Sequence, residues 1–142
     1  MQLSDQNRKT LLTDLHRIIQ EQTHHAIEKI FDSPLEDRSI YPPDVSKTAE
    51  EMQILAELPD NPNLRSALEK VFKDNTATVL FRFFSIIDRV GYPDPHSGTW
   101  APITMVDLPE QHEQDIDLHD NFFETYWDWK EKYRDQNHKP VS

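Results

Sequence analysis

Histidine and acidic side chains are the groups in this sequence that could bind a metal ion or transfer protons. A helix predicted over residues 4–31 carries two histidine–glutamate pairs, each spaced four residues apart: Glu21 with His25, and His24 with Glu28. Such pairs hold a metal ion where other helices supply further ligands. His24 points away from the apolar stripe of the helix, whereas His25 flanks that stripe, so His25 is the candidate metal ligand.

A second set of possible metal ligands lies around the end of the most apolar run of the chain. Two acids and two histidines can bind a divalent ion or perform acid–base catalysis. Their spacing matches no established motif, and 26 acidic residues and 7 histidines make chance proximity an ordinary outcome. The candidates in this set are Asp88, Asp94, His96 and His112.

His119 lies near the edge of the face that the last predicted helix turns toward the core. A histidine there could act as a buried general base or as a metal ligand. More often such a histidine donates one hydrogen bond within the core, and we favour that interpretation. All of these candidates belong to an alternative hypothesis, a metal-assisted hydrolase built on a helical bundle. Our main hypothesis has no bound cofactor.

Noncovalent recognition is the second kind of chemistry, and it belongs to the last helix, predicted over residues 117–134. Phe123 and Trp127, one turn apart, lie outside the stripe that is predicted to face the core. That core stripe consists of Leu118, Phe122, Tyr126, Trp129 and Tyr133. An off-core aromatic pair with a charged rim is typical of a protein interface. The alternative is that the loop at residues 91–116 covers both rings.

Charge indicates the kind of partner. The predicted partner-binding residues combine the two rings with carboxylates: Asp120, Phe123, Glu124, Trp127, Asp128 and Glu131. The whole chain has a formal net charge of −11 at pH 7, which attracts a basic protein. The same field repels nucleic-acid phosphates and anionic membranes, so we expect neither as a direct partner.

Composition narrows the possible activities further. The chain has no cysteine, which excludes disulfide and thiolate chemistry. It lacks a glycine-rich phosphate loop, a His-Glu-x-x-His pair and a Gly-x-Ser-x-Gly elbow, so enzymatic activity is uncertain and is the less favoured interpretation. The first residues do not resemble a signal peptide and no window reaches membrane-span length, so we expect a cytoplasmic protein.

An all-α fold must position these residues. Two glycines and ten prolines in 142 residues favour helices with stiff connections in one domain. We predict a single-domain bundle of about five helices around a central apolar helix at residues 76–90. The sequence is also compatible with a minor short strand near residues 103–106. Residues 135–142 are predicted to be a frayed tail.

Local signals indicate where the helices begin. Ser4 can cap the first helix, and Thr48 with Glu51 forms a capping-box pattern. Pro62 suits the first position of a third helix. This third helix either breaks near residues 73–75 or continues with a kink into the central helix.

Three stretches of the C-terminal half carry a resemblance. They are Phe-Ser-Ile-Ile-Asp-Arg-Val-Gly at residues 84–91, Trp100, and Leu-His-Asp-Asn-Phe-Phe-Glu at residues 118–124 with Tyr-Trp-Asp-Trp at residues 126–129. In these stretches the chain resembles small, acidic, helical bacterial proteins of uncharacterised activity, and the resemblance transfers no functional residues. In size and charge the chain is also similar to immunity proteins that neutralise basic toxins.

We therefore predict a cytosolic acidic protein-binding module, a regulator or an immunity-like antidote that binds a basic protein. The metal-assisted hydrolase is one alternative, and a structural or interaction protein of another kind is the other. The main hypothesis depends on whether Phe123 and Trp127 face solvent.

Overall fold

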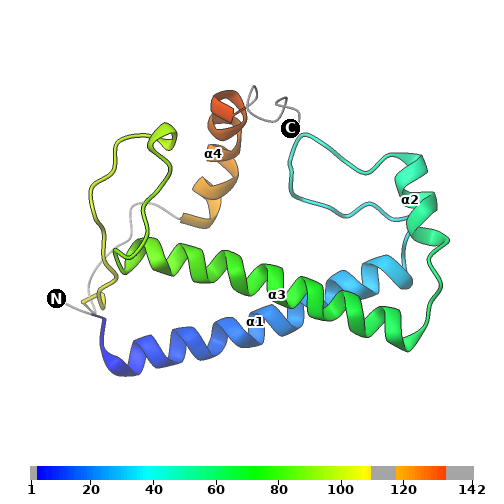
Figure 1. The fold of residues 1–142 in the computed structure, drawn as a ribbon, viewed down its shortest axis with the longest axis horizontal. Helices are drawn as coiled ribbons and strands as arrows, with labels where there is room; N and C mark the ends of the chain where they lie inside the picture. The colour runs from blue at the N-terminus through cyan, green and yellow to red at the C-terminus, as the bar shows by residue number, and fades with distance from the viewer. Residues whose placement is uncertain (1–2, 110–117, 134–142) are drawn as a thin grey trace, which may run out of the picture.

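Helices make up the regular structure of the chain (Figure 1). The structure, a computed structural model, describes residues 3–109 and 118–133. These two ranges contain four α-helices and one short 3-10 turn, and no strand. The elements are α1 (Asp5–Phe31), α2 (Ala49–Ala56), α3 (Pro62–Ile87), η1 (Pro95–Ser97) and α4 (Leu118–Tyr133). The predicted all-α character is confirmed.

The first three helices begin at the residues that the sequence signals predict. The Ser4 hydroxyl caps α1 by accepting a hydrogen bond from a backbone amide of the first turn. Thr48 and Glu51 form a complete capping box at the start of α2. Asn61 caps α3 directly ahead of Pro62. Each cap satisfies an amide that the helix itself leaves without a partner.

Helices α1 and α3 run antiparallel and pack against each other in the lower part of Figure 1. We call this pair the helix layer. Burial is greatest on α1, where Thr23 and Ile27 are buried. At one end of the layer the Arg65 guanidinium forms an ion pair with Asp32 at 3.1 Å and lies 4.7 Å from the centre of the Phe31 ring. Apolar burial and this contact together hold the two helices.

Residues 76–90 do not form a separate central helix, and this corrects the prediction. Most of this segment is the C-terminal part of α3, which continues without a break from the predicted third helix. Val79 and Phe83 are exposed, because α1 packs against one side of the segment only. The described ranges contain four α-helices, so the predicted number of about five is not confirmed.

The segment after α3 lies across one end of the helix layer. Residues 103–106 form no strand, because the described part of the chain offers no neighbouring strand to pair with. The segment instead contributes Met105 to the wall of a cavity of about 510 Å³ between the ends of α1 and α3. The Ser4 amide donates to the Asp107 carboxylate at 3.2 Å, which ties the segment to the start of α1.

Two further predictions concern the extent of the fold. The tail predicted at residues 135–142 lies outside the described residues. A single domain for the whole chain stays a prediction. None of the described helices combines the length and the apolar content that crossing a bilayer requires.

Candidate protein-binding surface

Helix α4 is attached to the rest of the molecule largely through the loop that precedes α2. The Tyr126 hydroxyl donates to Oδ1 of Asp44 at 2.5 Å, and the Lys130 ammonium pairs with Oδ2 of the same carboxylate. Tyr126 and Lys130 lie one turn apart, so both side chains reach the loop from one side of the helix. The Asp44 side chain is only 10% exposed, which strengthens these charge-assisted contacts. We call Asp44, Tyr126 and Lys130 the α4 clamp.

Aromatic rings surround the clamp. Tyr41, from the same loop as Asp44, stacks on Phe122 with ring centroids 6.0 Å apart and meets Tyr126 edge-on at 5.4 Å. The Trp129 ring lies 5.6 Å from that of Tyr126. These side chains line a shallow groove of about 250 Å³. Tyr126 is the one buried side chain among those described in α4.

A second carboxylate braces the loop that carries Tyr41 and Asp44. Asp37 accepts hydrogen bonds from the Lys47 ammonium at 2.8 Å, from the Lys47 amide at 2.7 Å and from the Ser39 amide at 3.1 Å. The side-chain hydrogen bond from Lys47 is the main reason that the pKa of Asp37 lies well below its usual range. The two ends of the loop are therefore joined, and the loop offers α4 a fixed surface.

The two rings predicted to meet a partner are exposed. Trp127 is 52% exposed and Phe123 is 36% exposed. The described part of the loop that the alternative interpretation places over them, residues 91–109, therefore leaves both rings open to solvent. The Lys130 ammonium lies 5.9 Å from the centre of the Trp127 ring, within the range of a cation–π contact, so the α4 clamp also orients Trp127. The role of both rings in binding stays a prediction.

The face of α4 predicted to be the core is itself largely exposed, and this corrects the prediction. Leu118, Phe122 and Trp129 are all exposed, whereas Tyr126 is buried. The physical reason is that α4 packs on a loop and on η1, and is not inserted between helices (Figure 1). Helix α4 therefore presents apolar side chains on two of its sides.

Carboxylates accompany the exposed rings. Glu124, Asp128 and Glu131 are exposed, and no basic side chain in the described part of the chain lies within ion-pair distance of them. The side chain of Asp120 lies outside what the structure describes. The three described carboxylates are thus available to a lysine or an arginine of another molecule.

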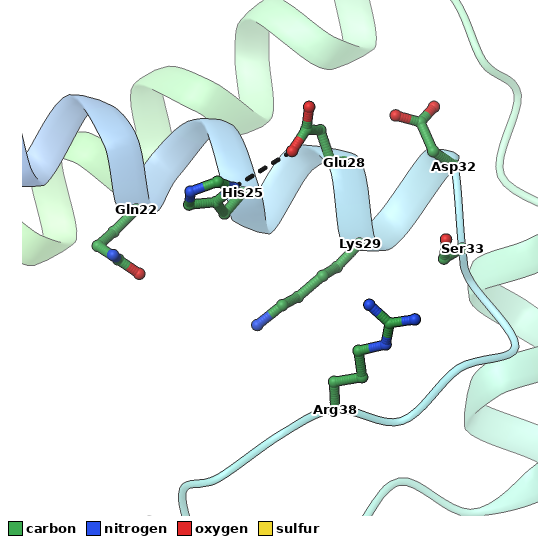
Figure 2. A pocket seen from close by; sticks show the side chains of 7 residues that line it. All are labelled: Gln22, His25, Glu28, Lys29, Asp32, Ser33 and Arg38. Atoms are coloured by element: carbon green, nitrogen blue, oxygen red, sulfur yellow. Dashed lines mark hydrogen bonds and ion pairs between the residues drawn. The ribbon is translucent and has the colours of Figure 1, made fainter.

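The candidate metal ligand His25 lies in an open groove along α1, shown in Figure 2. Its Nδ1 is 3.3 Å from a carboxylate oxygen of Glu28. The groove, of about 540 Å³, also holds Lys29 and Arg38, whose positive charges oppose the binding of a cation. The other residues that line it are Gln22, Asp32 and Ser33.

The other metal candidates occupy separate elements. His96 lies in η1 with its Nδ1 2.9 Å from Asp94, and Asp88 is the residue that ends α3. His119 is exposed at the start of α4, so its favoured interpretation as a core histidine is wrong. His112 lies outside the described residues. Among the residues that the structure describes, no three His, Asp or Glu side chains are grouped so as to hold a metal ion.

Sequence reasoning placed Tyr126 on the core face, and it missed Asp44, Lys130 and Tyr41, which support α4 together with Tyr126. Tyr126 and Lys130 at a spacing of four residues signal two polar side chains on one side of a helix. The sequence gives no sign of what they contact, because Tyr126 and Asp44 are 82 positions apart. Tyr41, in the loop before α2, packs against α4 in the same way across some eighty positions.

Comparisons with protein-family models, with curated proteins and with solved structures found no match to this chain. The function of α4 is therefore argued from its own chemistry. That chemistry consists of exposed rings, unpaired carboxylates and a support that fixes the helix.

Proposed function

We propose that this chain is a cytoplasmic, acidic protein-binding module, a regulator or antidote that holds a basic protein on α4. The observation that carries the proposal is the exposure of Phe123 and Trp127 beside Glu124, Asp128 and Glu131. Aromatic rings supply most of the binding energy in many interfaces, and a charged rim selects and orients the partner. A protein with an apolar patch surrounded by lysine and arginine is the matching partner.

The charge of the sequence that leads into α4 supports a basic partner over a neutral one. Residues 107–128 contain eight aspartate and glutamate residues and no lysine or arginine. Charges of one sign over such a stretch raise the association rate of an oppositely charged protein. Because salt screens charges beyond about 8 Å at physiological ionic strength, the association rate is expected to fall as salt is added.

The way α4 is held also favours binding. The α4 clamp joins the helix to the loop before a partner arrives, and the contact with Lys130 restrains the Trp127 ring. A side chain that is already ordered loses less conformational entropy when it binds. We therefore expect Trp127 to be the residue whose truncation weakens binding most.

A capture experiment with matched variants tests the proposal. The site variant combines Trp127→Ala with Asp128→Lys, and the control combines Phe81→Ala with Glu57→Lys, which makes the same kinds of change at exposed positions of α3 and at the end of α2. We expect the wild type and the control to retain one basic protein from source cells, and the site variant to lose it. Calorimetry with the purified partner should then show affinity weakened on the order of a hundredfold.

The salt dependence gives a second readout. Binding through α4 should weaken steadily as salt is raised, since opposite charges face each other across the interface. Retention of the same protein by the site variant, or binding that salt does not change, would count against the proposal.

A further inference from the structure

The accessible surface of the chain is too large for a compact protein of its size. It amounts to 12279 Å² for 16.8 kDa, whereas a compact monomer of this mass exposes about 7,700 Å². An allowance of roughly 3,300 Å², the surface of an extended chain, can be subtracted for the 19 residues outside the described ranges. The described residues then account for about 9,000 Å², whereas a compact protein of the same number of residues exposes about 6,900 Å². The excess of roughly 2,100 Å² is more than one partner buries in a protein–protein interface of standard size.

Part of the exposed apolar surface, including Ile18, Val79 and Phe83, lies along one side of the helix layer. On α1 and on α3, apolar residues recur every three or four positions and form two stripes. A shallow groove of about 200 Å³, lined by residues of both helices, joins the stripes, so they share one side of the layer. Val79 is 60% exposed and Phe83 is 51% exposed. We call this surface the apolar face, and its residues are Leu11, Leu15, Ile18, Gln22, Ala26, Leu68, Phe72, Asn75, Val79, Phe83 and Ile86.

The charge of the helix layer differs from that of the rest of the chain. Residues 5–31 carry four basic and four acidic side chains, and residues 62–87 carry four basic and two acidic ones, so the layer has a net charge of +2. Since the whole chain has a net charge of −11, the remaining residues carry −13. A basic partner has no electrostatic reason to dock on the layer. Two copies of the layer can approach each other without strong local repulsion.

Asn75 gives the apolar face a self-complementary polar group. It lies at the middle of α3 in a stripe of apolar residues and lines the shared groove. Within the described residues its amide has no hydrogen-bond partner. A carboxamide both donates and accepts, so two copies of Asn75 can pair across a two-fold axis. A single asparagine in an apolar helical seam commonly fixes register and the number of helices.

We infer that the apolar face binds a second copy of this chain. In the dimer, α1 and α3 of each copy pack face to face as a four-helix arrangement related by a two-fold axis. Helices of 26 and 27 residues extend about 40 Å, which is long enough for an interface of standard size. The inference stands apart from the proposed function, because it uses none of the partner-binding residues of α4.

Sedimentation of the full chain over a range of concentrations tests the inference. We expect the mass to rise toward twice 16.8 kDa as concentration increases. Phe83→Asp should weaken the dimer about a hundredfold, since each interface loses two rings and gains two charges. Phe81→Asp is the matched control on the same helix: Phe81 is 72% exposed and lies about opposite Phe83's stripe, so it should leave the dimer intact. Circular dichroism checks that both variants keep their helices.

A cysteine reporter keeps the test independent of stability. The natural chain has no cysteine, so a single introduced one gives an unambiguous cross-link. Under mild oxidation Asn75→Cys should form a covalent dimer, whereas Ala77→Cys, at an exposed position on the opposite side of α3, should not. A mass that stays at that of the monomer at every concentration would overturn the inference. The apolar face would then be covered by the chain's own α4 or by another partner. A dimer that Phe83→Asp leaves intact would overturn it as well.

Discussion

The helix layer and α4 expose apolar side chains in two different electrostatic settings. On the layer, exposed and half-buried apolar residues form two stripes in a region whose net charge is +2. On α4, a few large rings stand beside unpaired carboxylates. Exposed apolar surface marks a contact, and the charges around it indicate which partner that contact suits. The two settings therefore support two different proposals, a second copy on the layer and a basic protein on α4.

The two regions also differ in what holds them. The layer depends on the packing of two long helices, in which Ile27 of α1 is the one buried apolar side chain among the described residues. Helix α4 depends on one nearly buried carboxylate that receives two donors. Substitutions should therefore affect each region by a different mechanism, and the following predictions are ordered from the largest expected effect to the smallest.

Ile27→Ala should destabilise the helix layer by about 3 kcal/mol, because it leaves a cavity where a buried side chain was removed. Urea unfolding followed by circular dichroism measures this loss. Leu35→Ala is the control in an exposed loop position and should change stability by less than about 0.5 kcal/mol. Equal losses in the two variants would show that Ile27 is not part of a packed core.

Asp44→Ala should release α4 at a cost of about 2 kcal/mol, because Tyr126 and Lys130 lose their common acceptor. We place the figure below that of a fully buried pair, since the Lys130 side chain is 45% exposed. Hydrogen exchange should become faster in residues 118–133 and stay unchanged in α1 and α3. Asp128→Ala, on the same helix and outside the clamp, is the control. Unchanged exchange in α4 of the Asp44 variant would refute the clamp.

Salt should change the affinity of dimerisation and the affinity for a basic partner in opposite directions. We expect each affinity to change about tenfold between low and high ionic strength. Binding of a basic partner should weaken, since salt screens an attraction between unlike charges. Dimerisation should tighten, since each copy carries −11 and salt screens their repulsion. Sedimentation and calorimetry across a salt series measure both. If salt changed both affinities in the same direction, the two surfaces would not differ in the electrostatic way described above.

Acid should loosen the loop that supports α4, and this is the smallest effect. The pKa of Asp37 is lowered in the folded chain, chiefly by its hydrogen bond with the Lys47 side chain. The stabilisation is therefore fully present above pH of about 4, where the unfolded aspartate is ionised, and is lost as the pH falls through the lower folded pKa. Hydrogen exchange of residues 37–47 during acid titration measures it. Asp37→Asn should remove the pH dependence, and a variant that titrates like the wild type would contradict this assignment.

Local signals in the sequence predicted a large part of the helical structure. The caps at Ser4 and Thr48 and the start at Pro62 depend on hydrogen bonds and on backbone restrictions within a few residues, which the sequence shows directly. The predicted central helix was wrong for a reason that local signals cannot reveal. An apolar run indicates burial, yet it does not say whether the chain itself or another molecule supplies the cover.

The exposure of the two candidate rings was predictable from the sequence, and the support of α4 was not. Amphipathic spacing separated Phe123 and Trp127 from the other face of the helix, and both are exposed. The same reasoning expected Phe122 and Trp129 to be buried, which is wrong because α4 docks on a loop. The docking depends on Asp44 and Tyr41, and their contacts with α4 join positions some eighty residues apart, beyond the reach of any periodic pattern.

The distribution of tryptophan gives the two regions separate optical signals. The three indoles of the chain are Trp100, Trp127 and Trp129, and the helix layer contains none. Intrinsic fluorescence of the unlabelled protein therefore reports largely on α4 and its surroundings. A titration that shifts the emission reads out events on α4, and dimerisation of the layer should leave that emission nearly constant.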